Sequence, residues 1–566
     1  MSDPLQRRIA FSLSAVIVAL AVAGAFQHHS PVPYWDMWNG YLQFYMNATD
    51  GMIESWWAQH NEHRIVLARL LFFVDIAWFG GLGYFLIATQ LLMIAAAAAL
   101  WVSILREQVV GAHRVAHRTP RVVFACATTA VLFLWMQHEN LTWAFQSQFF
   151  LVQLLPLAAL ICLSRCDDGA RGTPLFVSAC MLGMASAAAM VNGVLALPLL
   201  MLTAIALRQR PARIVVLALA TAVTLLAYFA TYQSPPGHGA FATTLTTMPF
   251  QFVRYVLRYL GAPVYHLMGG GELARSAAVA AGALLCGLVA WRAWKILPRA
   301  MHHKPSIAVL AYLAYLLATA VATAGGRAMF GADQALSSRY ATPALMAWVA
   351  IAILYAPALL STTARRAHAT GLVALAALAG LGVAQTHAVL THPGTAFERE
   401  VAALALAMPV LDTAQIKKVF PAVEFVQNTA QQAAARGISI FAQRPYRDAA
   451  ARMGSTQLLG MFPTCKAAIT HLNTLADDPA HVKVTGWIEY AASVTLTASS
   501  LANADKRIAG WVMIDSATRS LSADNASTRA SFVGYARIAD GAITSIGERD
   551  AGIECSLAMP SSLALQ

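Results

Sequence analysis

The first 390 residues consist of long apolar stretches separated by short polar segments. A helix that crosses a membrane needs about 20 mainly apolar residues, and eleven stretches approach that length. They lie near residues 9–27, 82–105, 121–136, 147–165, 174–190, 193–207, 214–232, 272–291, 306–324, 341–360 and 370–390. The pattern therefore predicts an all-α, polytopic membrane domain over residues 1–390.

The first polar segment, residues 28–81, is too long for a simple turn. It begins PVPYWDMWNGYLQFYMNATDGMIESWWAQHNEHR, which is both aromatic and polar. It ends IVLARLLFFVDIAWFG, where Arg69 and Asp75 interrupt an apolar run. Charges at such positions suit a helix lying along the membrane surface better than one that crosses it. We expect a large loop that ends in an interfacial helix.

The last 176 residues carry two further patterns. Residues 391–460 have helical spacing, as in REVAALALAMPVLDTAQ and VEFVQNTAQQAAARG. From there the period changes to two in VKVTGWIEY, SVTLTASSL, RIAGWVMID and ASFVGYARI, with Asn, Asp, Ser and Gly turns between them. This predicts a helical connector, then a small β-sandwich-like domain over 461–566. Cys465 and Cys555 bracket that domain, and they can form a disulfide if it is exported.

Composition and charge fix the class and the orientation. The chain is 58% hydrophobic and 12% charged, whereas soluble domains carry about 25% charged residues. A soluble enzyme and a disordered chain are both excluded. The net charge is +12 and comes from residues 1–390, where basic residues fill every second loop. This is the positive-inside pattern and not a nucleic-acid surface. We therefore expect a protein of a bacterial inner membrane with its N-terminus in the cytoplasm. After eleven spans, its C-terminal domain lies in the periplasm.

The polar clusters fall on the predicted outer side. Asp36 stands between Trp35 and Trp38. Aromatic faces beside a carboxylate hold sugars, and the carboxylate can accept a proton from a hydroxyl nucleophile. Both Trp are equally expected as interface anchors. Asp36 is the candidate catalytic base.

A second cluster, His60-Asn61-Glu62-His63-Arg64, packs four kinds of polar side chain into five residues. His60 and His63 would share a face if this segment were a helix. With Glu62 they could then bind a divalent metal, Mg²⁺ or Mn²⁺. We favour the interpretation that the cluster binds a polar substrate or orients Asp36. Glu139, Gln146 and Gln148 are further candidates for substrate binding.

Four arginines on the same side are candidates for phosphate binding. Arg327 and Arg339 bracket a Gly-rich loop that also holds Tyr340. Guanidinium groups bind phosphate in a bidentate manner, so a lipid phosphate is the expected ligand. Arg254 and Arg258 lie four residues apart on a predicted amphipathic helix, which indicates an interfacial helix first and phosphate binding second.

With these residues in view, the layout resembles the polytopic glycosyltransferases of the GT-C class. Residues 1–105 look similar to the start of the aminoarabinose and mannosyl transferases of that class. The resemblance implies a sugar donor linked to polyprenyl phosphate. It also implies that Asp36 takes the position of the acidic residue that is the catalytic signature of this class. Many members have a second acid next to it, but here Met37 follows, so Glu62 is the first candidate for that role.

The implied reaction is an inverting transfer to an envelope glycan, lipid or protein. Asp36 would deprotonate the acceptor hydroxyl, and Arg327 and Arg339 would balance the phosphate that leaves. Three other functions stay open. A lipid or glycan transporter would have ionisable groups at mid-membrane. An O-antigen ligase or polymerase would have its large functional loop late in the chain, whereas here the loop with most polar residues is the first one. A scaffold would only display the β domain.

Overall fold

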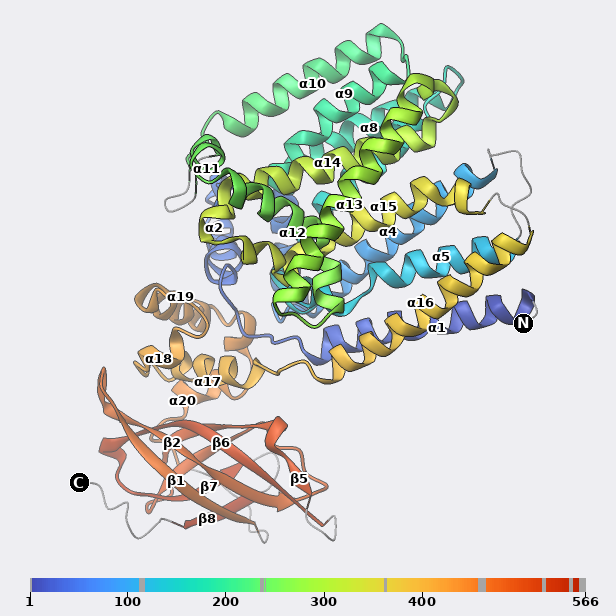
Figure 1. Ribbon diagram of the computed structural model, residues 1–566. Helices are drawn as coiled ribbons and strands as arrows, with labels where there is room; N and C mark the ends of the chain where they lie inside the picture. Colours follow the sequence, from blue (N-terminus) through green and yellow to red (C-terminus); the bar gives the residue numbers. More distant parts are fainter. Residues whose placement is uncertain are drawn as a thin grey trace. The chain divides into compact units, whose positions relative to one another are not determined.

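The computed structural model describes residues 3–110, 118–234, 239, 241–360, 364–456, 465–521, 526–548 and 553–558. Contacts divide the chain into two compact units (Figure 1). The helical unit comprises Met1–Gln27, Ile53–Leu71 and Tyr84–His392. The barrel unit comprises His28–Met52, Phe72–Gly83 and Pro393–Gln566. The predicted boundary at residue 460 lies outside the described residues.

The helical unit is built from α-helices joined by single 3₁₀ turns. Its helices are α1 (Asp3–Gln27), α4 (Tyr84–Val110), α5 (Arg118–Leu132), α6 (His138–Thr142), α7 (Ser147–Ser164), α8 (Gly172–Ala187), α9 (Ala196–Ala206), α10 (Pro211–Phe229), α11 (Phe241–Thr247), α12 (Pro249–Leu267), α13 (Glu272–Ile296), α14 (Lys304–Arg327), α15 (Ala341–Leu360) and α16 (Ala364–Leu390). The helix predicted at 65–80 is α3 (Val66–Phe79), and the division between the two units falls within it.

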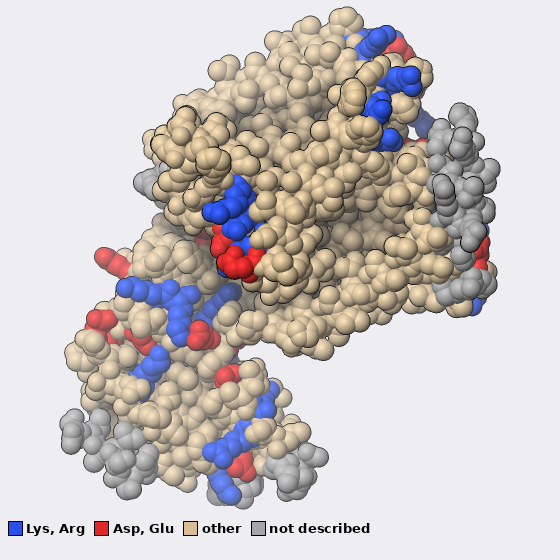
Figure 2. Space-filling model, in the orientation of Figure 1, with Lys and Arg blue, Asp and Glu red and all other residues tan. Residues whose placement is uncertain are grey.

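Within the described residues, nine helices are long and apolar enough to cross a membrane. The stretches predicted at 174–190 and 193–207 coincide with two shorter apolar helices, Gly172–Ala187 and Val191–Ala206. The structure therefore contains helices at all eleven predicted places, and nine of them have the length of a span. Figure 2 shows charged side chains gathered near the ends of these helices on the face in view.

The flanks of the helices are apolar even where they are exposed. In α10, only 11% of the most apolar window is buried, and its mean hydropathy is 2.0. Val215, Leu219, Val223 and Leu226 all point outward on this helix. A continuous apolar surface of this kind is costly in water, and it is compatible with a multi-pass membrane protein.

The helical part of the barrel unit joins segments that are far apart in the sequence. Its elements are the π-helix η1 (Trp38–Gln43) and the α-helices α2 (Phe44–Thr49), α17 (Ala396–Ala407), α18 (Thr413–Ile416), α19 (Val423–Arg436) and α20 (Tyr446–Ala451). The helical spacing seen in residues 391–460 is thus confirmed. Asp50 pairs with Arg436 at 2.9 Å, and the Ser439 hydroxyl donates to the Gly81 carbonyl at 2.9 Å. These contacts attach the two early segments to the C-terminal one.

The C-terminal sheet has eight strands: β1 (Lys466–Leu475), β2 (Asp478–Ala491), β3 (Ala498–Asn503), β4 (Ile508–Ile514), β5 (Ser520–Leu521), β6 (Ser527–Arg537), β7 (Ile543–Glu548) and β8 (Ile553–Ala558). The predicted β-sandwich is wrong, because the sheet closes on itself. Its order is β2-β1-β8-β7-β3-β4-β6-β5, and β2 also pairs with β6. Seven strands form a barrel, with β5 attached along β6. Closure removes the free sheet edges that a sandwich would keep.

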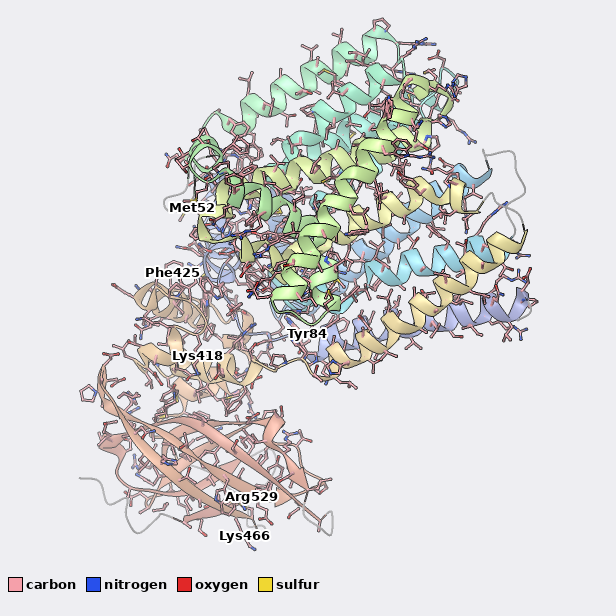
Figure 3. The ribbon with its side chains drawn as sticks, viewed as in Figure 1. Met52, Tyr84, Lys418, Phe425, Lys466 and Arg529 are labelled. Carbon is pink, nitrogen blue, oxygen red and sulfur yellow. A yellow bond between two sulfur atoms is a disulfide. The ribbon has the colours of Figure 1, made fainter. Side chains whose placement is uncertain are left out.

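The barrel interior follows from strict alternation along the strands. In β2, Val482, Val484, Ile488 and Tyr490 are buried, while the residues between them are partly exposed, apart from one glycine. That glycine, Gly486, packs against the Phe532 ring, where a Cβ would collide. A disulfide joins Cys465, which precedes β1, to Cys555 in β8, with their Cα atoms 5.3 Å apart. Figure 3 shows Lys466 and Arg529 on the barrel, and Lys418 and Phe425 on the helical part.

Candidate functional site

Asp36 lies in the turn between α1 and the π-helix η1, in the barrel unit. The residue before it, Trp35, has a backbone φ of +47°. A large side chain pays a steric penalty for that conformation. The Asp36 carbonyl accepts the Gly40 N–H at 2.8 Å, an α-type bond that leads into the π-helix. Both backbone features are uncommon and occur most often at functional sites.

The two predicted tryptophans differ in their surroundings. Trp35 is half exposed and lies edge-on to the rings of Tyr34 and Phe420. Trp38 is fully buried and contacts Phe441. Only Trp35 therefore presents an open aromatic face beside Asp36, whereas Trp38 belongs to the core that supports the turn.

Asp75 and Tyr41, for which the sequence predicted no role, form a buried polar pair in the barrel unit. The Tyr41 hydroxyl donates to Asp75 Oδ2 at 2.5 Å, and the Gly83 N–H donates to the same oxygen at 3.1 Å. Burial raises the pKa of Asp75 to about 6, and these two hydrogen bonds oppose that rise. The signal in the sequence was the single carboxylate within the apolar run at 65–80.

The His60–His63 segment is a tight hairpin, so the prediction that these two residues share a helix face is wrong. Their backbones exchange two hydrogen bonds, at 2.8 and 2.9 Å. Asn61 occupies the turn with a φ of +49°, which Asn tolerates better than most residues. The His60 ring lies 5.3 Å from the Phe145 ring, and the His63 Nδ1 accepts the Val191 N–H at 3.4 Å.

Glu62, at the tip of this hairpin, forms the central ion pair of the helical unit. Its Oε1 lies 2.8 Å from a guanidinium nitrogen of Arg327, and the two side chains are only 20% and 23% exposed. Burial disfavours the charged form of Glu62. The electrostatic effects of His63 and Arg327, together with the hydrogen bond from Arg327, outweigh that effect and lower the pKa of Glu62 to about 2. Glu62 is therefore ionised at neutral pH, and it is a poor base.

Arg64, predicted to bind substrate, is used to hold the fold. It is 2% exposed. Its guanidinium donates to the carbonyls of Tyr228 and Trp57 and to the Thr231 hydroxyl, at 2.7–3.0 Å. It also lies over the rings of Trp57 and Tyr228. All its donor groups face protein partners, and it ties the hairpin to the end of α10.

Glu139 and Arg339 meet through the backbone. The Glu139 carboxylate accepts the Arg339 N–H at 3.0 Å and the Ser337 hydroxyl at 3.2 Å. Glu139 thus stabilises the turn η9 (Ser338–Tyr340). The Arg339 guanidinium lies over the Tyr340 ring, and its buried Nε finds no hydrogen-bond partner among the described residues. This N–H is a donor suited to an anionic ligand.

The remaining candidates are spread over the helical unit. Arg258 pairs with Asp333, which also pairs with Arg275 at 3.3 Å, while Arg254 is exposed. Gln146 and Gln148 are buried at the start of α7, and the side-chain oxygen of each finds no partner in the described part of the chain. Two oxygens so placed can accept hydrogen bonds from a hydroxyl-rich molecule.

No group of three or more His, Cys, Asp or Glu residues that could hold a metal ion occurs among the described residues. The Glu62 carboxylate is directed to Arg327. No step of the reaction proposed below uses a metal ion.

In the barrel unit, Glu400 on α17 is a further perturbed acid. Burial, and then the negative charge of Asp515, raise the pKa of Glu400 to about 7. The nearby Tyr446 is buried, and its pKa lies well above the usual value. Glu400 therefore changes its charge near neutral pH.

These observations define a class of protein: a mostly helical, apolar chain, compatible with a multi-pass membrane protein, that carries a closed β-barrel and charged clusters at its helix ends. No protein-family model, curated protein or solved structure matches the chain.

Proposed function

We propose that the chain is a membrane glycosyltransferase that moves a sugar from a polyprenyl-phosphate carrier to a cell-envelope acceptor. One observation carries this proposal. Of the described residues, six other than glycine have a positive φ, and two of them, Trp35 and Asn61, directly precede the two candidate acids, Asp36 and Glu62. Backbone strain of this kind persists where a side chain must be held in a defined place.

The two acids have different roles in the proposed reaction. Asp36 accepts the proton of the acceptor hydroxyl. The hydroxyl oxygen then forms a bond to the anomeric carbon, and the bond from that carbon to the phosphate oxygen breaks. The lipid phosphate leaves with the electron pair, and the anomeric configuration inverts. Glu62 is a positioning residue, because its low pKa suits it to orient Arg327 and not to take up a proton.

Arginines and amides supply the rest of the proposed chemistry. Arg327 is oriented by Glu62, and Arg339 has a free donor. Both are suited to balance the charge that develops on the leaving phosphate. The indole face of Trp35 and the oxygens of Gln146 and Gln148 are suited to a sugar. In the proposed setting the N-terminus is cytoplasmic and the barrel unit is periplasmic, in the inner membrane of a bacterium. Nine spans and eleven spans give the same orientation, because both numbers are odd.

The test replaces Asp36 with Asn in the purified full-length protein. The measurement is release of polyprenyl phosphate from radiolabelled lipid-linked sugars, with total envelope extract as the source of acceptor. We expect release to fall by at least 10²-fold while the donor still binds. Glu398→Gln is the matched control, because Glu398 is exposed and pairs only peripherally with Lys418 at 3.0 Å.

Three outcomes would count against the proposal. Transfer at the wild-type rate in Asp36→Asn would remove Asp36 from the reaction. An equal loss in Glu398→Gln would show that the assay reports folding. Absence of transfer from every lipid-linked donor by the wild-type protein would favour a transporter or a scaffold.

A further inference from the structure

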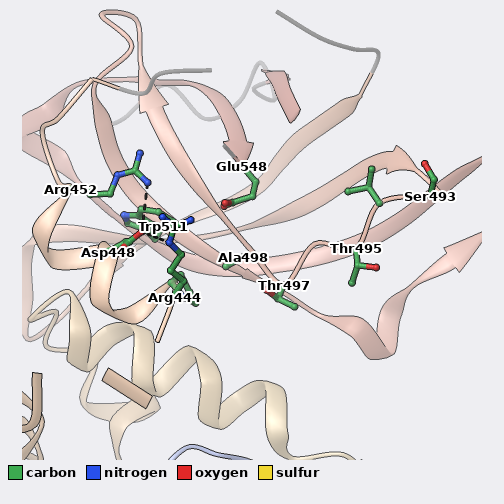
Figure 4. A pocket seen from close by; sticks show the side chains of 11 residues that line it. Arg444, Asp448, Arg452, Ser493, Thr495, Thr497, Ala498, Trp511 and Glu548 are labelled. Atoms are coloured by element: carbon green, nitrogen blue, oxygen red, sulfur yellow. Dashed lines mark ion pairs between the residues drawn. The ribbon is translucent and has the colours of Figure 1, made fainter. Parts of the chain in front are cut away.

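The barrel unit contains a pocket that no part of the proposed reaction uses. Its volume is about 480 Å³, within the range of sites for small molecules. Residues of α20 and its flanks line one wall, and the strands β3, β4 and β7 with the 493–497 loop line the other. Figure 4 shows Arg444, Asp448 and Arg452 grouped around Trp511, and Thr495 and Thr497 further along the pocket. We call it the barrel pocket.

Trp511 is the central side chain of the barrel pocket. On β4 the residues Val512 and Ile514 belong to the barrel core, so alternation places Trp511 on the outer face. It is nevertheless only 3% exposed. Its indole N–H has no hydrogen-bond partner among the described residues. A buried donor of this kind is costly unless something accepts its hydrogen bond. A ligand in the pocket would supply that acceptor.

The charges that line the barrel pocket are balanced. Arg444 and Arg452 are opposed by Asp448 and Glu548. Asp448 Oδ2 lies 3.1 Å from Arg444 and 3.8 Å from Arg452. An anion would meet two carboxylates and a cation would meet two guanidiniums. The lining therefore favours a neutral ligand.

The polar groups of the pocket match hydroxyl groups. Guanidiniums and the indole only donate hydrogen bonds, ionised carboxylates only accept them, and the threonine hydroxyls do both. A ligand whose groups both donate and accept hydrogen bonds can pair with the donors and the acceptors of this lining alike. The Arg452 guanidinium lies 5.9 Å from the Trp511 ring. The hydroxyl groups of a sugar both donate and accept hydrogen bonds.

We propose that the barrel pocket binds a neutral saccharide unit. The proposal does not depend on the glycosyltransferase function, since a transporter or scaffold could carry the same site. It places a glycan-binding site on the barrel unit, formed entirely by residues 444–548.

The test measures binding of free sugars to the full-length protein in lipid nanodiscs, which avoids glycoside detergents. The probes are glucose, galactose, mannose, N-acetylglucosamine, arabinose and rhamnose, with glucuronate as the anionic probe. Saturation-transfer NMR reports contact. The variant is Trp511→Phe, which keeps an aromatic ring and removes the N–H donor. Trp487→Phe is the matched control, because Trp487 lies on β2 with Arg529 3.9 Å from its ring and does not line the pocket.

We expect at least one neutral sugar to bind the wild-type protein and Trp487→Phe equally. Binding to Trp511→Phe should weaken about tenfold, the effect of losing one buried hydrogen bond. If Trp511→Phe does not fold, Glu548→Gln takes its place with the same expectation. The proposal is overturned if no neutral sugar binds, if glucuronate alone binds, or if the pocket variant binds as the wild type does.

Discussion

The ion pair between Glu62 and Arg327 gives the sharpest quantitative prediction. The perturbation is Glu62→Gln, which leaves Arg327 partly buried without its partner. The pKa of Glu62 is about 2 in the folded chain, against an ordinary value of 4.5. At 1.36 kcal/mol for each pKa unit, the surroundings of Glu62, chiefly His63 and Arg327, stabilise its ionised form in the fold by about 3 kcal/mol. Loss of one partner of a buried pair costs a similar amount.

The assay is thermal unfolding of the purified protein, followed by tryptophan fluorescence. We expect the midpoint of Glu62→Gln to fall by roughly 3–5 °C at pH 7. Glu272→Gln is the control, because Glu272 is 84% exposed although it also pairs with an arginine, Arg275. Exposed pairs contribute little, so this midpoint should stay near that of the wild type.

The pH dependence supplies the refutation. Because the folded pKa is lower than the unfolded one, ionised Glu62 stabilises the fold above pH 4.5, and that stabilisation is lost as the pH falls towards 2. The difference in unfolding midpoint between the wild type and Glu62→Gln should be constant above pH 5 and should narrow below pH 4.5. A gap of less than 1 °C at pH 7, or one that does not narrow in acid, would refute the reasoning.

Three further predictions concern the barrel unit. The Cys465–Cys555 disulfide closes a loop of 90 residues, so Cys465→Ser with Cys555→Ser should destabilise the barrel by about 4 kcal/mol; unfolding that is unchanged by reductant would contradict this. Glu400→Gln should stabilise the barrel unit at pH 8. The pKa of Glu400 is raised in the folded unit, so the wild-type stability falls as the pH rises from 4.5 through about 7. The check is whether the variant melts at the same temperature at pH 5 and pH 8. Tyr41→Phe should cost about 1–3 kcal/mol, since Asp75 keeps only the Gly83 N–H of its two hydrogen bonds; half-buried Tyr45→Phe is the control, and equal melting of the two variants would exclude a special role for the pair.

Local patterns in the sequence predicted the elements of this chain well. Apolar length located the helices, and alternation located β2, β3, β4 and β6 in the stretches where the sequence had strands. The closure of the barrel was missed, because it depends on pairing between β1 and β8 and between β2 and β6. These pairings join distant segments, and no local period records them.

The candidate site was predicted only in part, because many of its contacts also join distant segments. The spacing of His60 and His63 would place them on one face of a helix, but a positive φ at Asn61 makes the segment a hairpin. Arg64 looked like a ligand residue because its partners, Tyr228 and Thr231, lie over 160 positions away. Trp511 was part of an apolar strand in the sequence, and only the fold shows that its indole N–H is buried without an acceptor.

The assembly of the barrel unit from three stretches has a consequence for biosynthesis. Residues 84–392 separate its second stretch from its third. At about 5–20 residues per second, the ribosome needs roughly 15–60 s to make that interval. During that time two early residues have been synthesised without their partners. The Trp35 N–H donates to the Val419 carbonyl in the folded unit, and Asp50 pairs with Arg436. The early segments must then stay accessible until the last part of the chain is delivered, and a nascent chain stalled before residue 393 should expose them to proteases.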